Sequence, residues 1–265
     1  IKDKAWIKNI MHIVGAGDQA LDDLLTQNMD GYKSIITGPL YGADVFTFKK
    51  TSTDAVSQVS DKTVEYLINN GLSMITYFGH SSSTTLEFNI DNPENYSNYA
   101  KYPLFLGLGC NVGSFFGYST LRLQTNKETL SEKYVLAPDR GMIGVVGSTH
   151  FGIVHYLNIW AERAYQEITG KSYGKTVGEI IKETASDVFQ YTTQEDFYAR
   201  CNAEETLFHG DPAIRLNTHA KPDYAIEDSM VKISPTFVSV GDQDFKVDAQ
   251  FLNLGKSPDS TMVIE

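Results

Sequence analysis

The sequence predicts an α/β fold in which a mostly parallel sheet carries helices on both of its faces. Two short apolar segments, residues 73–80 and 102–110, are rich in β-branched and aromatic residues, as buried strands are. Each ends in a reactive side chain directly after a glycine, His80 in the first segment and Cys110 in the second. Further apolar segments alternate with helical ones along the chain, which is the pattern of βαβ units.

The composition is that of a globular protein. The chain has 265 residues, of which 42% are hydrophobic and 21% charged. A net charge of −11 without a basic stripe argues against binding to nucleic acid or to an anionic membrane surface. No apolar run approaches the roughly 20 residues that span a membrane, so membrane insertion is not expected. Because the sequence opens without an initiator methionine, we expect a piece of a longer protein with adjoining domains.

The first half of the chain predicts three strands and two helices. A strand at residues 6–14 ends at a Gly-Ala-Gly turn, and Asp18 is placed to cap the helix that follows. This turn lacks the third glycine of a dinucleotide-binding loop, so it is weak evidence for a phosphate site. The expected elements are a strand at 6–14, a helix at 19–28, a strand at 43–49, a helix at 61–70 and a strand at 73–80.

The second half continues the alternation of strands and helices. A polar loop separates the strand that ends in His80 from the strand that ends in Cys110. A turn at residues 210–216 is expected to feed one last short strand. The expected elements are strands at 102–110 and 141–147, and helices at 130–136, 157–167, 176–190 and 196–207.

The character of the sequence changes after Lys221-Pro222. Short alternating segments separated by turn residues predict strands at 231–234, 237–240, 245–252 and 261–264. This is the pattern of a β-sandwich, but a complete sandwich of this type needs about 100 residues. We therefore expect two domains, an α/β domain at residues 1–220 and the beginning of an all-β sandwich at residues 221–265.

His80 and Cys110 carry the chemistry that the sequence predicts. If their strands are parallel neighbours, the two side chains meet at the carboxyl edge of the sheet, where catalytic groups of open α/β sheets lie. A thiol needs a base to become a nucleophile near neutral pH, and the imidazole that takes its proton can then protonate a leaving amine. The N–H of Cys110 and that of Ser81 or Gly79 are candidate donors to the developing oxyanion.

Other uses of these residue types fit the sequence less well. No spacing of histidines and cysteines supplies three ligands for zinc, so no metal site is predicted. The Gly-x-Ser-x-Gly pattern of a serine hydrolase is missing around His80. Cys201 is expected to be an ordinary helical residue, although the sequence leaves a disulfide with Cys110 open. The acidic loop at residues 87–94 fits no EF-hand pattern, and a solvated loop is its default interpretation.

Three motifs resemble the gingipain family of cysteine peptidases. They are Tyr77-Phe78-Gly79-His80-Ser81-Ser82, Gly109-Cys110-Asn111-Val112-Gly113 and the closing Phe208-His209-Gly210-Asp211-Pro212-Ala213. The resemblance implies a caspase-like three-layer sandwich, followed by an immunoglobulin-like domain and preceded by a subdomain that this sequence lacks. It implies His80 as general base and acid and Cys110 as nucleophile. It also implies a peptide or protein substrate, no cofactor for the chemistry, and calcium as a structural ion.

The resemblance extends to a substrate pocket and departs from the family pattern in two places, after the histidine and at the acid that follows the first strand. Residues Ser148, Thr149, His150 and Phe151 would line the pocket for the residue before the scissile bond, with His150 as the second candidate base. The family usually has glycine directly after the catalytic histidine, whereas this chain has Ser81, whose β-carbon would crowd or shift the oxyanion hole. Asp18 is the nearest candidate for the family's acid that orients the histidine or lines the pocket, with helix capping as the alternative.

The sequence therefore favours a cysteine endopeptidase that works through an acyl-enzyme. Two alternatives remain. The first is a gingipain-like scaffold that has lost its activity and serves binding or assembly. The second is a processing peptidase or transpeptidase of a bacterial secretion machinery, of the type IX kind. The resemblance places the protein outside the cell or on a bacterial surface.

Overall fold

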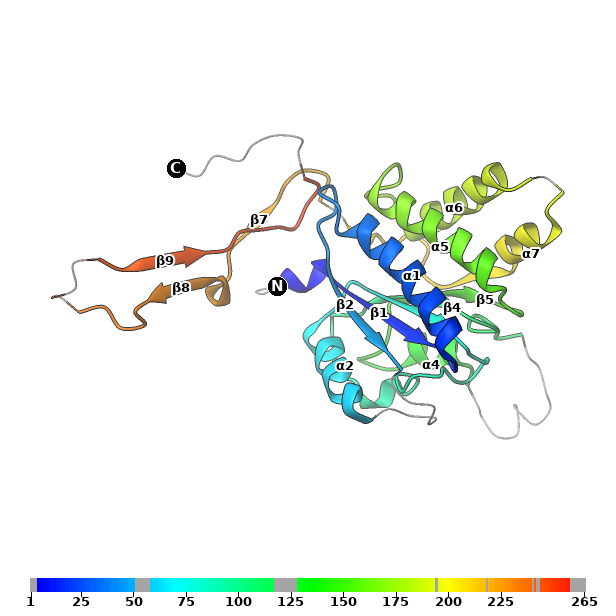
Figure 1. The fold of residues 1–265 in the computed structure, drawn as a ribbon, viewed down its shortest axis with the longest axis horizontal. Coiled ribbons are helices and arrows are strands. Elements are labelled where there is room, and N and C mark those ends of the chain that lie inside the picture. The colour runs from blue at the N-terminus through cyan, green and yellow to red at the C-terminus, as the bar shows by residue number, and fades with distance from the viewer. Residues whose placement is uncertain are drawn as a thin grey trace.

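A computed structural model describes residues 4–50, 58–116, 128–193, 195–217, 219–239, 241 and 244–257. Its centre is a six-stranded sheet in the order β2-β1-β3-β4-β5-β6 (Figure 1). The first five strands are parallel to their neighbours, and β6 runs antiparallel to β5. The strands are β1 (Asn9–Gly15), β2 (Asp44–Lys49), β3 (Met74–Gly79), β4 (Leu104–Leu108), β5 (Gly144–Ser148) and β6 (Thr206–Gly210).

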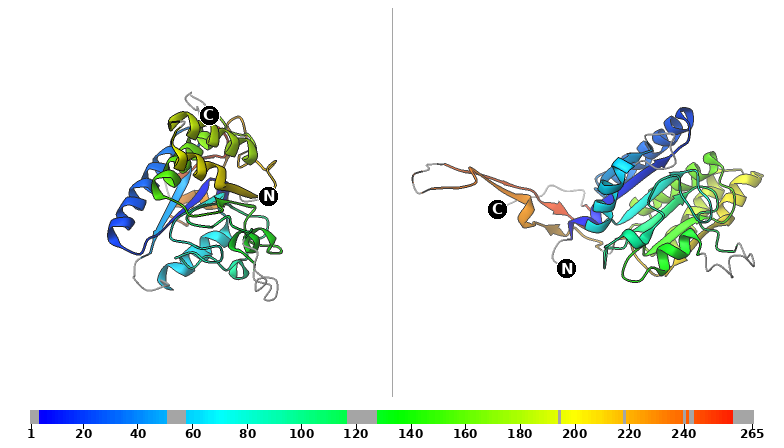
Figure 2. Two further views of the ribbon diagram at one scale, coloured as in Figure 1. Left: turned by 90° about the vertical axis from the view of Figure 1, so that its right-hand side faces the viewer. Right: turned by 90° about the horizontal axis from the view of Figure 1, so that it is seen from below.

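Helices cover both faces of the sheet, so the domain has three layers (Figure 2). The described helices are α1 (Gln19–Ile36), α2 (Gln58–Asn70), α4 (Leu130–Leu136), α5 (Val154–Thr169), α6 (Val177–Tyr191) and α7 (Phe197–Glu205). Short 3₁₀ turns occupy Ala5–Lys8, Pro93–Asn95 and Asp228–Met230. The predicted fold class, a mostly parallel sheet between helices, is confirmed.

The alternation of side chains along the strands creates two separate cores. On β1, Ile10 and Val14 face the core that α1, α5 and α6 close, whereas Met11 and Ile13 face the core of α2 and α4. Successive residues of a strand point to opposite faces, so a strand covered on both sides is apolar throughout. This is why the segments that end in His80 and Cys110 are continuous apolar runs.

The structure corrects the length of the first helix. The predicted helix stops at residue 28, before Asp30 and Gly31, which are poor helix formers. In the structure α1 continues to Ile36, because Met29, Tyr32 and Ile36 repeat at helical spacing and are fully buried against the sheet. The burial of three large side chains outweighs the roughly 1 kcal/mol that one glycine costs a helix.

The last strand of the sheet was predicted in the wrong place. The sequence pattern indicates a helix as far as residue 207 and a strand after the turn at 210–216. The structure ends α7 at Glu205, and β6 occupies Thr206–Gly210 before that turn. The pairing of His209 with Val145 and of Phe208 with Val146 explains the difference, because it supplies hydrogen bonds that no local pattern reveals.

After the α/β domain, the described residues form two small ribbons that project from it (Figure 1). Strand β7 (Tyr224–Ala225) pairs with β10 (Leu252–Asn253), and β8 (Val231–Ser234) pairs with β9 (Lys246–Ala249), both antiparallel. The predicted strand at 231–234 is confirmed and that at 245–252 in part. Residues 237–239 form no strand, and residues 261–264 lie outside the described part of the chain. The immunoglobulin-like sandwich and the domain boundary at residue 220 stay predictions.

Candidate active site

The register of β3 and β4 places His80 and Cys110 at equivalent positions. Phe78 pairs with Leu108 across the two parallel strands. His80 follows Phe78 by two positions, and Cys110 follows Leu108 by two positions. The His80 side chain is exposed, and Cys110 is half-buried. The sequence-predicted pair therefore lies at one edge of the sheet, at the ends of adjacent strands. No hydrogen bond joins the imidazole to the thiol within the described residues, and free enzymes often hold such pairs loosely.

A serine hydroxyl connects the two strand ends directly. Ser81 Oγ donates to the carbonyl oxygen of Cys110 at 2.9 Å. The loops approach so closely that a β-carbon on Gly109 would lie 2.2 Å from Ser81 Oγ and 2.7 Å from the Gly79 carbonyl oxygen. Glycine at position 109 is therefore required by space, and the Ser81 side chain is directed at the Cys110 backbone.

Backbone contacts fix the segment that carries His80. The N–H of His80 donates to the Gly15 carbonyl at 3.0 Å, which extends the pairing of β3 with β1 by one residue. Its carbonyl accepts from the N–H of Glu87 at 3.2 Å and from the hydroxyl of the buried Tyr77. The Tyr77 hydroxyl in turn accepts from the Glu87 N–H at 3.1 Å. Burial raises the pKa of Tyr77 above its ordinary value, so the hydroxyl stays a donor.

An acid and a base that sequence reasoning missed lie beside His80. Glu87 Oε2 and His80 Cδ2 lie 3.9 and 4.0 Å from the point where Gly17 would carry a β-carbon. Lys50, whose side chain is only 7% exposed, forms an ion pair with Glu87 Oε2 at 3.2 Å. Glu87 belongs to the loop that was predicted as solvated and acidic. The N–H of Glu87 donates to the Tyr77 hydroxyl and to the His80 carbonyl, and both bonds depend on how that loop folds back, which no local pattern reveals.

Asp18 takes the structural role that was its alternative. Its side chain accepts from the N–H of Leu21 at 2.9 Å and so caps α1. The capping prediction is confirmed. A role for Asp18 in orienting His80 or lining a pocket stays a prediction, and Glu87 is the carboxylate that the structure brings next to the histidine.

The predicted pocket segment packs along the loop that follows Cys110. The N–H groups of Asn111 and Gly113 donate to the carbonyls of His150 and Ser148, at 2.8 and 2.9 Å. Cys110 Sγ lies 3.8 Å from the carbonyl oxygen of Gly152. Residues 148–152 thus border the thiol at the end of β5, as the order of strands requires.

The four predicted pocket residues differ in exposure. Ser148 is buried, and its hydroxyl contacts the backbone of His150 at 3.2 and 3.3 Å. Thr149 is half-buried, and its N–H donates to the Glu205 carbonyl at 2.9 Å. His150 and Phe151 are exposed, with their rings edge to face at 4.8 Å, and Phe151 is 69% exposed. His150 and Phe151 are therefore the most exposed of the four residues.

Two backbone donors at the site are unoccupied. Within the described residues, the N–H groups of Ser81 and Cys110 donate to no protein acceptor. Buried or half-buried N–H groups in proteins are almost always paired, so two free donors at the ends of adjacent strands suit an oxygen atom of a bound substrate. Both belong to the candidate oxyanion donors named above, and their role in the chemistry stays a prediction.

The other cysteine and the histidine of β1 have structural surroundings. Both cysteines are free thiols, with Cys201 in α7. His12 is buried in β1, where Nε2 lies 2.7 Å from the Tyr165 hydroxyl, and burial lowers its pKa to about 3. No group of three His, Cys, Asp or Glu side chains within the described residues is arranged to hold a metal ion.

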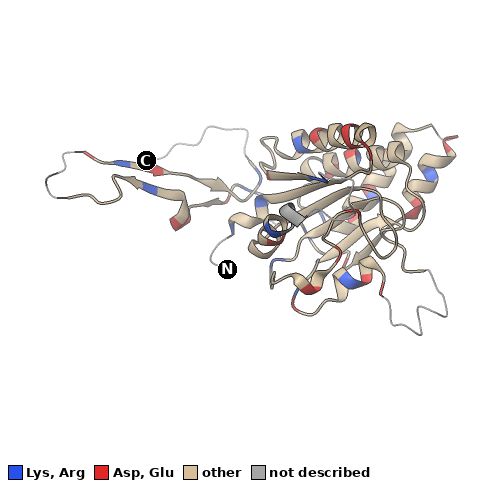
Figure 3. Ribbon diagram, turned by 60° about the horizontal axis from the view of Figure 1, so that its bottom comes forward, with Lys and Arg blue, Asp and Glu red and all other residues tan. Residues whose placement is uncertain are grey.

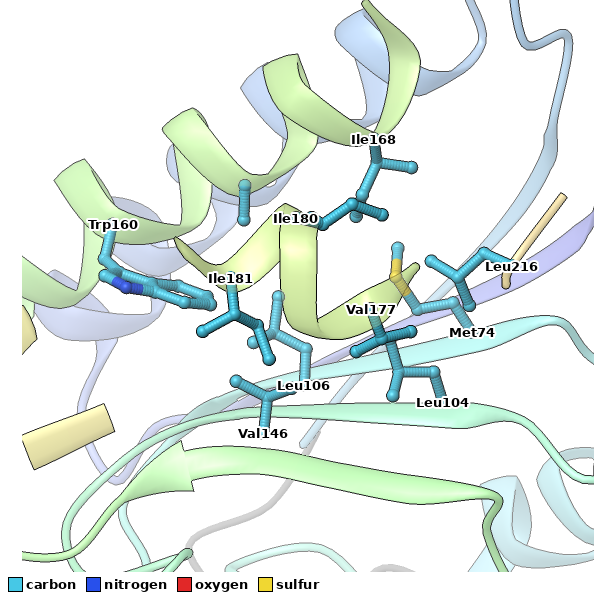
Figure 4. Close-up of a pocket in the computed structure, with 11 residues that line it drawn as sticks. Met74, Leu104, Leu106, Val146, Trp160, Ile168, Val177, Ile180, Ile181 and Leu216 are labelled. Atoms are coloured by element: carbon cyan, nitrogen blue, oxygen red, sulfur yellow. The ribbon is translucent and has the colours of Figure 1, made fainter. Parts of the chain in front are cut away.

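A small cavity lies away from these groups, toward the amino ends of the strands. It measures about 20 Å³, sits between the sheet and helices α5 and α6, and is lined by apolar side chains alone (Figure 4). Met74 and Leu104, the first residues of β3 and β4, border it, so it opens near the amino ends of the strands. It has room for about one water molecule and no polar partner for it, which marks it as a packing defect.

A mostly parallel sheet between two helical layers, with a histidine and a cysteine at adjacent strand ends, is the architecture of an α/β cysteine peptidase. The sequence model of peptidase family C25 matches residues 2–217 of this chain, and the chain belongs to this family of cysteine peptidases. The comparison with curated proteins gave no match.

Solved structures of gingipain share the fold. The Arg-specific cysteine proteinase gingipain R is 14% identical, with a TM-score of 0.64 over 86% of this chain and 52% of its own. The complex of Porphyromonas gingivalis RgpB pro- and mature domains is also 14% identical, with a TM-score of 0.60 over 86% and 53%. This chain therefore spans about half the length of the gingipain chains that it matches.

Proposed function

We propose that this chain hydrolyses peptide bonds in proteins through the thiol of Cys110 and the imidazole of His80. The observation that carries the proposal is the equivalent placement of the two residues at the ends of paired strands, beside two free backbone N–H groups. Membership of peptidase family C25 supports the choice of peptide bonds over other acyl substrates.

The proposed reaction has two halves. His80 removes the proton of the Cys110 thiol, and the thiolate attacks the carbonyl carbon of the scissile peptide. The N–H groups of Ser81 and Cys110 stabilise the oxyanion. When the C–N bond breaks, the imidazolium protonates the leaving amine, and a thioester remains on Cys110. His80 then accepts a proton from water, whose oxygen attacks the thioester. The C–S bond breaks, the carboxylic acid is released, and the imidazolium returns its proton to the Cys110 sulfur.

The chain's substrate recognition is assigned to the segment after β5. Phe151 and His150 are exposed next to the thiol-bearing loop, so we propose that they contact the substrate side chain before the scissile bond. Ser148 and Thr149 would support them through the backbone. Structural calcium in the loop at residues 87–94 remains a further proposal.

By family, we propose a site of action outside the cell or on a bacterial surface. The gingipain complex of pro- and mature domains concerns that protein, and the adjoining domains proposed for this chain rest on sequence alone. In the described part of the chain, the helices are all too short or too polar to cross a bilayer.

Covalent labelling tests the proposed function. Peptide acyloxymethyl ketones, varied in the residue next to the reactive group, are expected to modify Cys110 in the wild-type protein. The Cys110→Ala variant should not be labelled, and His80→Ala should be labelled at least about a hundredfold more slowly, because general base catalysis typically contributes a factor of 10² to 10⁴. Mass spectrometry of the modified peptide gives the measurement.

The control is Cys201→Ala, which removes the other free thiol and should leave labelling unchanged. Equal labelling of wild type and Cys110→Ala would overturn the proposal and leave the binding or assembly module. Labelling of Cys110 together with transfer of a peptide acyl group to an added amine would instead favour the transpeptidase.

A further inference from the structure

Three consecutive serines follow His80, and the first of them contacts the Cys110 loop. The Ser81 hydroxyl donates to the Cys110 carbonyl at 2.9 Å. The Ser82 hydroxyl lies 3.3 Å from Thr84 Oγ1 and 2.9 Å from Thr85 Oγ1, within its own loop. The bond of Ser81 therefore joins the ends of β3 and β4, whereas the contacts of Ser82 serve one loop only.

The peptide group after Cys110 is held at both of its ends. Its carbonyl, on Cys110, accepts from Ser81 Oγ, and its N–H, on Asn111, donates to the His150 carbonyl at 2.8 Å. Asn111 itself has a φ of 58°, in the left-handed region that asparagine adopts more readily than most other residues with a side chain. Here the two hydrogen bonds, one from each neighbouring strand end, hold this peptide plane.

The same two residues carry the free backbone donors of the site. The Ser81 and Cys110 N–H groups have no protein acceptor among the described residues. The hydroxyl bond ties Ser81 to Cys110, so it also limits how far these N–H groups move apart. A pair of donors stabilises an oxyanion only when both stay in position without reorganising during the reaction.

We propose that Ser81 is a positioning residue, whose hydroxyl holds the Cys110–Asn111 peptide and thereby sets the spacing of the two oxyanion donors. The inference rests on the proposed function and extends it. The Ser81 side chain was expected to crowd or shift the oxyanion hole, and it contacts the Cys110 carbonyl instead.

Two reagents separate this role from a general effect on the thiol. A peptide aldehyde adds to the thiol and leaves an oxygen atom where the oxyanion would lie, so its affinity depends on the donors. Iodoacetamide is attacked at a saturated carbon and develops no oxyanion, so its rate reports only on the reactivity of Cys110. The protein is used as the full chain of 265 residues, with acetylated tripeptide aldehydes that vary in the terminal residue.

The Ser81→Ala variant is expected to bind the aldehydes about fivefold to tenfold more weakly, as loss of one hydrogen bond predicts. Its iodoacetamide rate should stay within twofold of wild type. Ser81→Thr retains the hydroxyl and should recover most of the aldehyde affinity. Ser83→Ala is the matched control, because Ser83 accepts from the Leu130 N–H at 2.7 Å through its backbone carbonyl and not its hydroxyl.

Unchanged aldehyde affinity in Ser81→Ala would overturn the positioning role while leaving the peptidase intact. An equal decrease in the aldehyde affinity and in the iodoacetamide rate would also overturn the positioning role, since the hydroxyl would then act on the reactivity of the thiol. Wild-type protein that binds no aldehyde, with Cys110→Ala behaving alike, would overturn the proposed function itself and the positioning role with it.

Discussion

Lys8 places an ammonium group inside the protein, where it joins three segments of the chain. Its side chain is 1% exposed, and Nζ donates to the carbonyls of Tyr41 at 2.6 Å and Gly255 at 3.4 Å. It also lies 4.7 Å from the centre of the Tyr41 ring. Two carbonyls and a ring compensate only part of the lost hydration, so burial lowers the pKa of Lys8 to about 8.

Alkaline pH is therefore expected to stabilise the fold through Lys8. Between pH 8 and 10 the residue is neutral in the folded protein and still protonated in the unfolded chain, so the unfolded state binds more protons and stability rises with pH. The free energy of unfolding rises by at most about 3 kcal/mol, and most of this rise occurs before pH 10 is reached. Urea unfolding at pH 7.5, 8.5 and 9.5 measures the effect.

The matched variant is Lys8→Met, whose unbranched side chain is one atom shorter and carries no charge. Its free energy of unfolding should not show this rise. Buried tyrosines with raised pKa values, such as Tyr41 at about 12, ionise first in the unfolded chain and lower stability above pH 10 in both proteins. Parallel pH dependence of wild type and Lys8→Met below pH 10 would contradict the assignment.

At the site, single residues are held mainly by the backbone. The segment that bears His80 is tied to β1 through Gly15 and to Glu87, and the segment that bears Cys110 is tied to the end of β5. The Lys50–Glu87 ion pair adds charged groups next to the segment that bears His80. The site thus depends less on any one polar side chain than on the register of four parallel strands.

At the scale of elements, helix α1 contains a glycine that neither packing nor conformation requires. Gly31 is exposed in the middle of the helix, and a β-carbon there would have no atom within 4 Å. Gly31→Ala is expected to raise the free energy of unfolding by about 0.5–1 kcal/mol, because alanine has fewer unfolded conformations to lose. Thermal or urea unfolding measures the gain.

Gly15, at the end of β1, makes the opposite prediction as a control. A β-carbon there would lie 2.3 Å from the hydroxyl oxygen of Tyr77, the group that holds the His80 carbonyl. Gly15→Ala should therefore lower stability and also slow labelling of Cys110, whereas Gly31→Ala should leave labelling unchanged. Stabilisation by both changes would show that the contact between β1 and Tyr77 is looser than described.

At the scale of the whole molecule, the candidate active site and the apolar cavity lie toward opposite ends of the strands. The candidate site occupies the carboxyl edge of the sheet, and the apolar cavity lies beneath α5 and α6 toward the amino ends of β3 and β4 (Figure 4). Acidic and basic residues are interspersed over the helices and loops (Figure 3). Changes to the cavity should therefore act on stability alone.

Filling the cavity is expected to stabilise the protein without altering the site. Val177 borders the cavity at the start of α6 and is fully buried, and Val177→Ile adds one methylene. The expected gain is about 0.5–1 kcal/mol, given roughly 0.8 kcal/mol per buried methylene. The measurement is urea unfolding, with the rate of Cys110 labelling as the check on activity.

Val145→Ile is the matched control, since Val145 is fully buried on the opposite face of β5 and does not border the cavity. Overpacking there should destabilise by about 1 kcal/mol or more. If Val177→Ile also destabilised the protein, the cavity would be too small or too rigid to accept a methyl group.

The ribbon of β8 and β9 has one apolar face and one polar face. Its register places Val231, Ile233, Val247 and Ala249 on one face and Lys232, Ser234, Lys246 and Asp248 on the other. Two such strands alone are marginally stable. The alternation of apolar and polar residues predicts the two strands. A second sheet that would pack against them, as in a β-sandwich, stays a prediction.

Much of the fold follows from local pattern. Apolar runs predicted the strands that end near His80 and Cys110, and the capping signal of Asp18 begins α1 where the structure has it. The sequence by itself therefore determined the α/β class and the strands that end at His80 and Cys110, because strand and helix periods and caps act within a few residues of one another.

Contacts between distant residues were decided by the tertiary structure alone. The extension of α1 past Gly31, the position of β6, the Lys50–Glu87 pair beside His80 and the bond from Ser81 to the Cys110 carbonyl all join segments that are far apart in the chain. Each depends on which strands pair and in which register. That choice is made by burial over the whole sheet, so no local pattern records that Ser81 reaches across to the neighbouring strand end.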